Sequence, residues 1–224
     1  MLGTINEAVE AEVITKNVAY KIKLPAHTKK KIEPFSSEEV KLLLDSAADF
    51  LKLYLAIGFH TGLRTAEILA LRVEDIDFKN RIISVRRAIS SGNISTTKTQ
   101  GSMRQVPLFD ILLPYLEDLP TEGYLFQTKE GNHYAALPGH QQRAWVKLLE
   151  DNNLEYRKIY STRHTFIVSM LQNSDLSILQ IAQLAGHVNT AMVIHNYAVY
   201  IRNNHLRITR GLDIFADKSA DIVA

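Results

Sequence analysis

The spacing of hydrophobic residues changes from helical to alternating once along the chain, and then changes back. From residue 36 to about residue 72, apolar residues recur at helical spacing, and from about 75 to 107 they alternate with polar residues. Helical spacing returns from residue 109 to residue 199. We therefore predict a mainly α-helical domain of the α+β class, with one small antiparallel β-sheet of two or three strands near its middle.

The first helices of this domain have recognisable ends. In FSSEEVKLLL, Ser36 or Ser37 is a candidate N-cap, and Glu38 and Glu39 suit the positive end of a helix. The segment FLKLYLAIGFHTG is apolar nearly all round, which predicts a buried helix that ends near Gly62. The segment RTAEILALR predicts another short helix.

The alternating segment predicts short strands joined by turns. EDIDFKNRIISVRRA has Lys79 and Asn80 between apolar positions, which is typical of a hairpin. SSGNISTTKTQGSMRQVPL predicts a strand, a polar turn and a strand. Residues 1–20 are expected to form one amphipathic helix, or the end of one, and further helices are expected at about 109–118, 138–152, 161–173, 177–185 and 190–199.

The composition is that of a globular protein. Hydrophobic residues make up 46% of the 224 residues and charged residues 22%, which argues against disorder. The absence of cysteine excludes disulfides and thiolate zinc sites and favours an intracellular protein. The start, MLGTINEAVE, lacks the features of a signal peptide, and the apolar run LYLAIGF is far too short to span a membrane. We expect a cytoplasmic protein, and its net charge of +2 permits nucleic acid as a partner without requiring it.

The segment KIKLPAHTKKKIEPF divides the chain into a short first part and the main domain. Proline and a run of positive charge are typical of a linker, either a solvated hinge or a basic strap that follows a phosphate backbone. We predict an N-terminal region with its basic linker at 1–33, the main domain at 34–200 and a weakly helical C-terminal tail at 201–224. The candidate DNA-binding residues are the linker lysines Lys21, Lys23, Lys29, Lys30 and Lys31.

Several polar residues lie at the edges of the expected elements, and each has an ordinary structural explanation. An arginine at a helix start is usually solvated or paired with a carboxylate, and a lysine in a turn is usually solvated. A histidine after glycine often neighbours a helix C-cap, and a tyrosine on an apolar helix is usually part of the core. The residues in question are Arg64, Lys98, Arg163, His164, His187 and Tyr197.

Taken together, their contexts resemble the four conserved boxes of the tyrosine recombinase (phage-type integrase) family over residues 35–200. HTGLRTAEILAL is similar to the first arginine box, in which a carboxylate, here Glu67, follows three residues after the arginine. TTKTQGSMRQVPL is similar to the β-hairpin lysine box, and STRHTF to the second arginine box. LAGHVNTAMVIHNY is similar to the last box, in which a tyrosine follows Gly-His after nine or ten residues. Four boxes in the family's order predict the tyrosine recombinase catalytic-domain fold.

The resemblance implies DNA strand cleavage and rejoining through a 3′-phosphotyrosine intermediate, with Tyr197 as the nucleophile. Two arginines, Arg64 and Arg163, would hold the non-bridging phosphate oxygens with paired planar donors. Lys98 would protonate the leaving 5′-oxygen, and His187 would donate a hydrogen bond to the phosphate. The covalent link conserves the bond energy, so neither metal, ATP nor any other cofactor is expected.

One position departs from the family pattern. The family usually has histidine three residues before the second arginine, where this chain has Tyr160. A neutral phenol can donate a hydrogen bond to phosphate but is a poor base near neutral pH. His164 and His195 are possible substitutes, although the place of His164 is usually structural in the family. Tyr200 has a spacing that the family does not use, and we interpret it as structural.

The resemblance also implies partners, and two other functions stay open. Double-stranded DNA is the expected partner, with a tetramer on DNA, a monomer without it, and a tail that docks on a neighbouring subunit. The family's N-terminal helical domain is longer than residues 1–33, so a catalytic domain is expected here. The alternatives are a type IB topoisomerase-like enzyme and a non-catalytic regulator, since SDLSILQIAQLAGHVNTAMV is similar to a helix-turn-helix.

Overall fold

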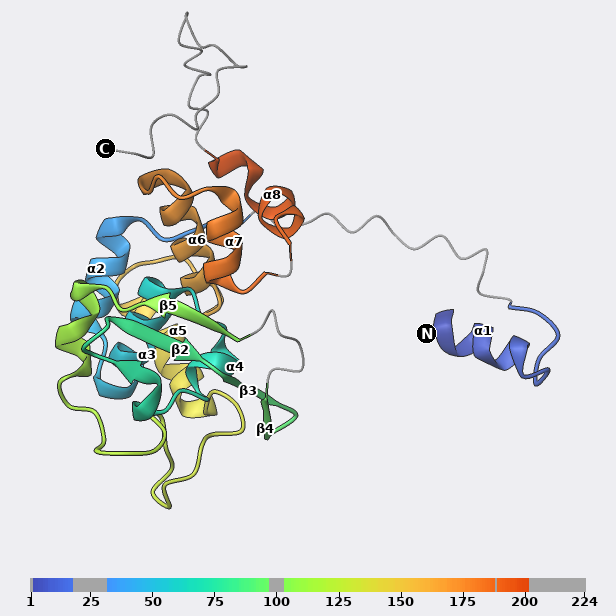
Figure 1. Cartoon of the computed structure of the whole chain (residues 1–224), viewed down its shortest axis with the longest axis horizontal. Helices are drawn as coiled ribbons and strands as arrows, with labels where there is room; N and C mark the ends of the chain where they lie inside the picture. Colours follow the sequence, from blue (N-terminus) through green and yellow to red (C-terminus); the bar gives the residue numbers. More distant parts are fainter. Residues whose placement is uncertain (1, 18–31, 97–102, 188, 202–224) are drawn as a thin grey trace, which may run out of the picture. The chain divides into compact units, whose positions relative to one another are not determined.

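The computed structural model describes residues 2–17, 32–96, 103–187 and 189–201 (Figure 1). The chain divides into two compact units, Met1–Lys31 and Ile32–Ala224, which we describe separately. In the first unit, α1 spans Leu2–Glu10, so the prediction of a helix over residues 1–20 is wrong for residues 11–17, and residues 18–20 lie outside the described part. The helix ends because Glu12 adopts a left-handed conformation with φ 57°, and the Val13 amide bonds back to the Ala8 carbonyl at 2.9 Å.

The helices of the second unit agree closely with the predicted ones. Ser36 is the N-cap of α2: its hydroxyl accepts the Glu39 amide at 3.2 Å, and Glu39 accepts the Ser36 amide at 2.7 Å. The helices are α2 (Ser37–Ser46), α3 (Asp49–Thr61), α4 (Thr65–Ile68), α5 (Gly139–Asp151), α6 (Ser161–Asn173), α7 (Ile178–Ala185) and α8 (Ala191–Tyr197).

Three 3₁₀ segments also occur among the described residues of this unit. The predicted helix at 109–118 is one of them, η3 (Asp110–Leu116), which contains Pro114. Proline lacks the amide hydrogen of an α-helical ladder, so an α-helix is disfavoured here, although Leu112 and Leu116 still reach the core. The other two are η2 (Val73–Asp75) and η4 (Ala198–Tyr200).

The prediction of a single sheet is wrong, because the strands form two sheets. The first is antiparallel with the order β1-β2-β5, and the second is the pair β3-β4. β5 returns to β2 and places Val106 opposite Ile83, and both are buried, whereas no described side chain of β3 or β4 is fully buried. The strands are β1 (Ile76–Asp77), β2 (Ile82–Val85), β3 (Arg87–Ser90), β4 (Asn93–Thr96) and β5 (Arg104–Pro107).

The buried hydrophobic residues form two clusters that meet at α6. The larger cluster surrounds α3, whose Leu55, Ala56 and Ile57 are almost completely buried, and it includes the inner face of β2 and β5. The smaller cluster lies among α6, α7 and α8, which Figure 1 shows together at one end of this unit. α6 packs against both α3, in the larger cluster, and α7, in the smaller one.

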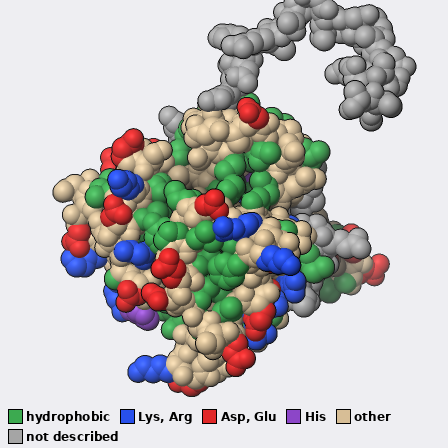
Figure 2. Space-filling model, turned by 60° about the vertical axis from the view of Figure 1, so that its left-hand side comes forward, with side chains coloured by type: hydrophobic (Ala, Val, Ile, Leu, Met, Phe, Trp, Pro, Cys, Tyr) green, Lys and Arg blue, Asp and Glu red, His purple; other side chains and the backbone are tan. Residues whose placement is uncertain are grey.

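Figure 2 shows one face of the molecule, on which acidic and basic side chains are interspersed with hydrophobic ones. This face of the described residues therefore carries no field of a single sign of charge. None of the helices in the described ranges is both long and apolar enough to cross a membrane.

Candidate active site

Two glycines that end helices present their carbonyl groups to the two candidate arginines. Gly62 ends α3 with φ 64°, and Gly186 ends α7 with φ 68°. A Cβ atom at Gly62 would lie 2.3 Å from the Phe166 ring, and one at Gly186 would lie 2.6 Å from a guanidinium nitrogen of Arg104. Backbone conformation and close packing thus both require glycine in HTGLR and LAGH.

Arg163, in the first turn of α6, is almost completely buried. Its side chain donates from Nη1 to the Gly62 carbonyl at 2.7 Å, and the residue is 1% exposed. Its Nε and Nη2 atoms are buried without a hydrogen-bond partner among the described residues. Burial lowers the pKa of this guanidinium, but arginine stays charged near neutral pH. Unpaired buried donors on a cation are costly, so the side chain is suited to bind an anion.

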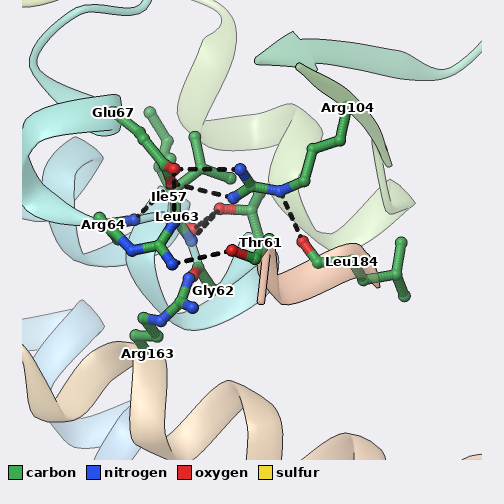
Figure 3. Close-up of polar contacts among 10 residues, drawn as sticks. Ile57, Thr61, Gly62, Leu63, Arg64, Glu67, Arg104, Arg163 and Leu184 are labelled. Carbon is green, nitrogen blue, oxygen red and sulfur yellow. Dashed lines mark hydrogen bonds and ion pairs between the residues drawn. The ribbon is translucent and has the colours of Figure 1, made fainter. Parts of the chain in front are cut away.

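Arg64 lies at the start of α4 and is held in place from two sides (Figure 3). Its Nη1 donates to Glu67 at 2.9 Å, and its Nη2 donates to the Gly186 carbonyl at 2.8 Å. The Glu67 carboxylate also accepts the backbone amide of Arg64 at 2.8 Å. The Arg64 side chain remains 38% exposed, so it combines a fixed orientation with access from solvent.

Arg104, on β5, belongs to the same network and was missed by the sequence interpretation. It donates to both carboxylate oxygens of Glu67, at 3.0 and 2.9 Å, and from Nε to the Leu184 carbonyl at 2.8 Å. Arg104 therefore links β5, α4 and the end of α7 (Figure 3). A signal was available, because Arg104 and Val106 share one face of a strand, and an inward arginine needs a carboxylate partner.

The Glu67 carboxylate is ionised in the folded protein. Its burial opposes ionisation, but the hydrogen bonds and charges of Arg104 and Arg64 outweigh it and lower the pKa of Glu67 to about 2. A lowered folded pKa stabilises the protein above the unfolded pKa of about 4.3, and this contribution is lost as the pH falls towards about 2. Glu67 thus stays a charged anchor for both arginines near neutral pH.

We expect Arg104→Ala to destabilise the fold strongly, because it leaves the buried Glu67 carboxylate with half of its partners. Breaking a buried ion pair costs on the order of 3–5 kcal/mol in free energy of unfolding. Lys147→Ala is the control, since it removes the exposed pair of Lys147 with Asp151, and little change is expected. The measurement is urea unfolding at pH 7, and equal midpoints for the two variants would contradict this role of Arg104.

His187 follows Gly186 and lies close to the arginines. Burial and the positive charges of Arg163, Arg64 and Arg104 lower the pKa of His187 to about 4. Near neutral pH it is therefore a neutral imidazole, with one N–H available to donate. Its Nδ1 atom is buried without a hydrogen-bond partner among the described residues.

Six of the candidate residues lie outside the described part of the chain, so their contacts stay predictions. They are the candidate general acid Lys98 and the linker lysines Lys21, Lys23, Lys29, Lys30 and Lys31.

Tyr197, at the end of α8, is part of the core, as a tyrosine on an apolar helix usually is. The residue is 2% exposed and belongs to the hydrophobic cluster of α6, α7 and α8. Its hydroxyl is hydrogen-bonded to Nδ1 of His164 at 2.6 Å. Burial raises the pKa of this phenol, although the positive charge of Arg163 acts in the opposite direction. The hydroxyl is thus neutral and hydrogen-bonded in this structure.

The two other tyrosines have different environments. Tyr200 donates its hydroxyl to the Ile32 carbonyl at 2.5 Å, which is the structural role we predicted for it. Tyr160 precedes α6 and is 39% exposed. Its ring packs edge-on against His164, with ring centroids 5.1 Å apart. The structure therefore places Tyr160 beside the histidine that contacts Tyr197.

The described candidates gather around the start of α6. The charge of Arg163 affects the pKa of both His187 and Tyr197, and Arg64 reaches the backbone next to His187. The arrangement offers two arginines and a neutral imidazole to one anion, with a phenol hydroxyl nearby. This combination can bind a phosphate group and attack it.

Comparison with known proteins finds a matching family and relatives. The model of the phage integrase family matches residues 33–203. A tyrosine recombinase XerC-like protein of Caldanaerobacter subterraneus subsp. tengcongensis is 28% identical, over 86% of this chain and 58% of the relative. This chain therefore spans little more than half of that relative's length.

Solved structures show the same fold. The Tn1549 transposon integrase, in complex with a circular intermediate DNA, superimposes with a TM-score of 0.72 at 20% identity, covering 88% of this chain and 71% of that one. A lambda integrase dimer bound to a COC′ core site gives a TM-score of 0.63 at 16% identity, covering 92% of this chain and 57% of that one. The prediction of a mainly helical tyrosine recombinase catalytic-domain fold is confirmed, and the chain belongs to the phage integrase family.

Proposed function

We propose that this chain is the catalytic part of a site-specific DNA recombinase or integrase. It cleaves and rejoins DNA strands through a 3′-phosphotyrosine intermediate and requires neither metal nor ATP. The observation that carries the proposal is the buried Arg163, whose Nε and Nη2 donors have no partner among the described residues and whose charge acts on His187 and Tyr197. An anionic phosphodiester supplies the acceptors that these donors lack.

Each candidate site residue that the structure describes has a proposed role supported by its position. Arg163 and Arg64 bind the non-bridging oxygens, on which negative charge builds up in the transition state. Neutral His187 donates one further hydrogen bond, and the exposed Tyr160 can donate another. Tyr197 attacks the phosphorus, and the 5′-oxygen leaves. Since Tyr197 is buried in this structure, attack requires that its hydroxyl move towards the phosphate.

The direct test is a nicked suicide duplex carrying the cognate site, followed by mapping of the covalently linked peptide. A nick near the cleavage position lets the leaving fragment diffuse away, so the adduct accumulates. We expect an adduct that survives SDS and maps to Tyr197. An absence of adduct on the cognate site would refute the proposal and favour a non-catalytic regulator, whereas relaxation of supercoils without strand exchange between two sites would favour a type IB topoisomerase.

Lys98 is the proposed general acid, which protonates the leaving 5′-oxygen. We expect a substrate with a 5′-bridging sulfur to restore cleavage by Lys98→Ala, because a thiolate leaves without a proton. The same substrate should not restore cleavage by Arg64→Ala, because this variant lacks a phosphate-binding group. The measurement is the rate of adduct formation with the oxygen and the sulfur substrate, and equal rescue of both variants would exclude the general-acid role.

Partners and location follow from the proposed activity. The protein acts on double-stranded DNA in the cytoplasm, as a tetramer on its site and a monomer without DNA. The lysines of the 1–33 segment contact the phosphate backbone, and the 201–224 tail docks on a neighbouring subunit. The relatives named above support DNA as the partner, because two of them were solved in complex with DNA.

A further inference from the structure

We propose that His164 is the residue that accepts the proton of Tyr197 when this tyrosine attacks the phosphate. The inference rests on the proposed function and assigns a role that the family pattern leaves open in this chain. The evidence is the direct contact of the two side chains, together with the identity of the residue at position 160.

The contact joins the reacting atom to a ring nitrogen. His164 Nδ1 lies 2.6 Å from the hydroxyl oxygen of Tyr197, a distance at which a proton can be transferred. The two rings lie with centroids 5.7 Å apart, on α6 and α8. With its proton on Nε2, the neutral imidazole directs the lone pair of Nδ1 at the hydroxyl, which then donates the hydrogen bond.

Tyr160 cannot take this proton. A phenol has an ordinary pKa of about 10, so a neutral phenol is not a base near pH 7. The Tyr160 ring packs edge-on against His164. His164 is therefore an imidazole within hydrogen-bonding distance of the nucleophile, adjacent to a position where the family usually has histidine.

The charges around His164 change when phosphate binds. Burial and the positive charge of Arg163 lower the pKa of His164 to about 4. The groups that face it are Arg163 on its own helix, Tyr160 just before that helix, Tyr197 on α8 and His187 just after α7. A phosphate anion bound by Arg163 offsets that positive charge and raises the pKa of His164. The developing phenolate raises it further, so His164 becomes a better proton acceptor as the reaction begins.

The complete step balances without another reactant. The O–H bond of Tyr197 breaks, and its proton passes to Nδ1 of His164. A bond forms between the Tyr197 oxygen and phosphorus, the bond from phosphorus to the 5′-oxygen breaks, and Lys98 protonates that oxygen. In rejoining, the 5′-hydroxyl gives a proton back to Lys98, and the His164 imidazolium returns its proton to Tyr197.

The test is the pH dependence of adduct formation on the suicide duplex by the wild type and by His164→Asn. Asparagine retains a hydrogen-bond acceptor near the position of Nδ1 but does not titrate. We expect its cleavage rate at pH 7 to fall by roughly 10²–10⁴-fold, the usual contribution of a general base. The wild-type rate should decline at acidic pH as His164 becomes protonated, and this decline should be absent in the variant. DNA affinity should change little.

The control is His140→Asn, the same substitution at an exposed histidine of α5, which should cleave like the wild type. The 5′-sulfur substrate should not rescue His164→Asn, because the leaving group is not its defect. Unchanged or faster cleavage by His164→Asn, or rescue by sulfur, would overturn the role of His164 while the Tyr197 adduct of the wild type still supports the proposed function.

If His164→Asn does not fold, the wild type alone decides the question. With the 5′-sulfur substrate the leaving group needs no proton. If the decline of the cleavage rate at acidic pH comes from protonation of the group that accepts the proton of Tyr197, it must persist with this substrate. A rate that stays constant as the pH falls from 7 to about 4, the pKa of His164 before phosphate binds, would overturn the inference, because protonated His164 cannot accept the proton of Tyr197. Absence of any wild-type adduct would overturn the proposed function itself, and this inference with it.

Discussion

Replacing Tyr197 with phenylalanine should abolish the covalent DNA adduct and leave DNA affinity nearly unchanged. The substitution removes one oxygen, and the phenylalanine ring fills the same apolar space among α6, α7 and α8. The lost hydrogen bond to His164 should cost about 1 kcal/mol of stability, the usual net contribution of such a bond. The measurement is adduct formation on the suicide duplex, analysed in SDS, alongside a binding titration.

Tyr200→Phe is the matched control for this experiment. Tyr200 lies three residues further on and donates its hydroxyl to the Ile32 carbonyl, away from His164. Its variant should form the adduct at a rate close to that of the wild type. An adduct formed by Tyr197→Phe, or a linked peptide whose modified residue is Tyr200, would show that the nucleophile is misassigned.

Replacing Arg163 with lysine should reduce cleavage by about 10²-fold or more, in line with the loss of one preorganised donor to the transition state. Lysine keeps the positive charge but loses the planar fork. A lysine that bonded to the Gly62 carbonyl would lack the Nε and Nη2 donors of Arg163, which are buried without a partner among the described residues. DNA affinity should fall much less than the rate, because the net charge of the protein is unchanged.

The matched control for Arg163→Lys is Arg81→Lys, which makes the same substitution at an exposed arginine paired with Asp110. Cleavage by this variant should equal that of the wild type. Single-turnover rates with saturating protein separate the chemical step from DNA binding, and thermal unfolding shows whether Arg163→Lys is folded. A folded Arg163→Lys that cleaves within about fivefold of the wild type would mean that the buried guanidinium is only structural, since a lost transition-state donor costs about 10²-fold or more.

The amino-acid sequence was sufficient to predict the local features of the fold. Helix boundaries depend on neighbouring residues, as in the capping box of Ser36 and Glu39 and the left-handed Gly62 and Gly186. α6 was predicted at 161–173 and spans Ser161–Asn173. The order and spacing of the four boxes were likewise sufficient to predict the family, because both are properties of the chain itself.

Contacts between distant residues were decided by the tertiary structure. The pairing of β5 with β2, and hence the presence of two sheets, depends on which strands bury Ile83 and Val106 together. Arg104 and Glu67 are 37 residues apart, and their ion pair exists because β5 and α4 meet inside the protein. Periodicity indicates which side of a strand faces inward but not which carboxylate it will meet there.

Tyr197 also shows which features the sequence predicts and which depend on the tertiary structure. Its distance along the chain from Gly-His identified it as the candidate nucleophile, since that spacing belongs to one helix and the loop before it. Its burial and its hydrogen bond to His164, 33 residues away, arise from the packing of α8 against α6. The sequence therefore determined which side chains could take part in the chemistry. Only the packing of the helices decided which side chains touch, because burial and proton transfer depend on neighbours in space.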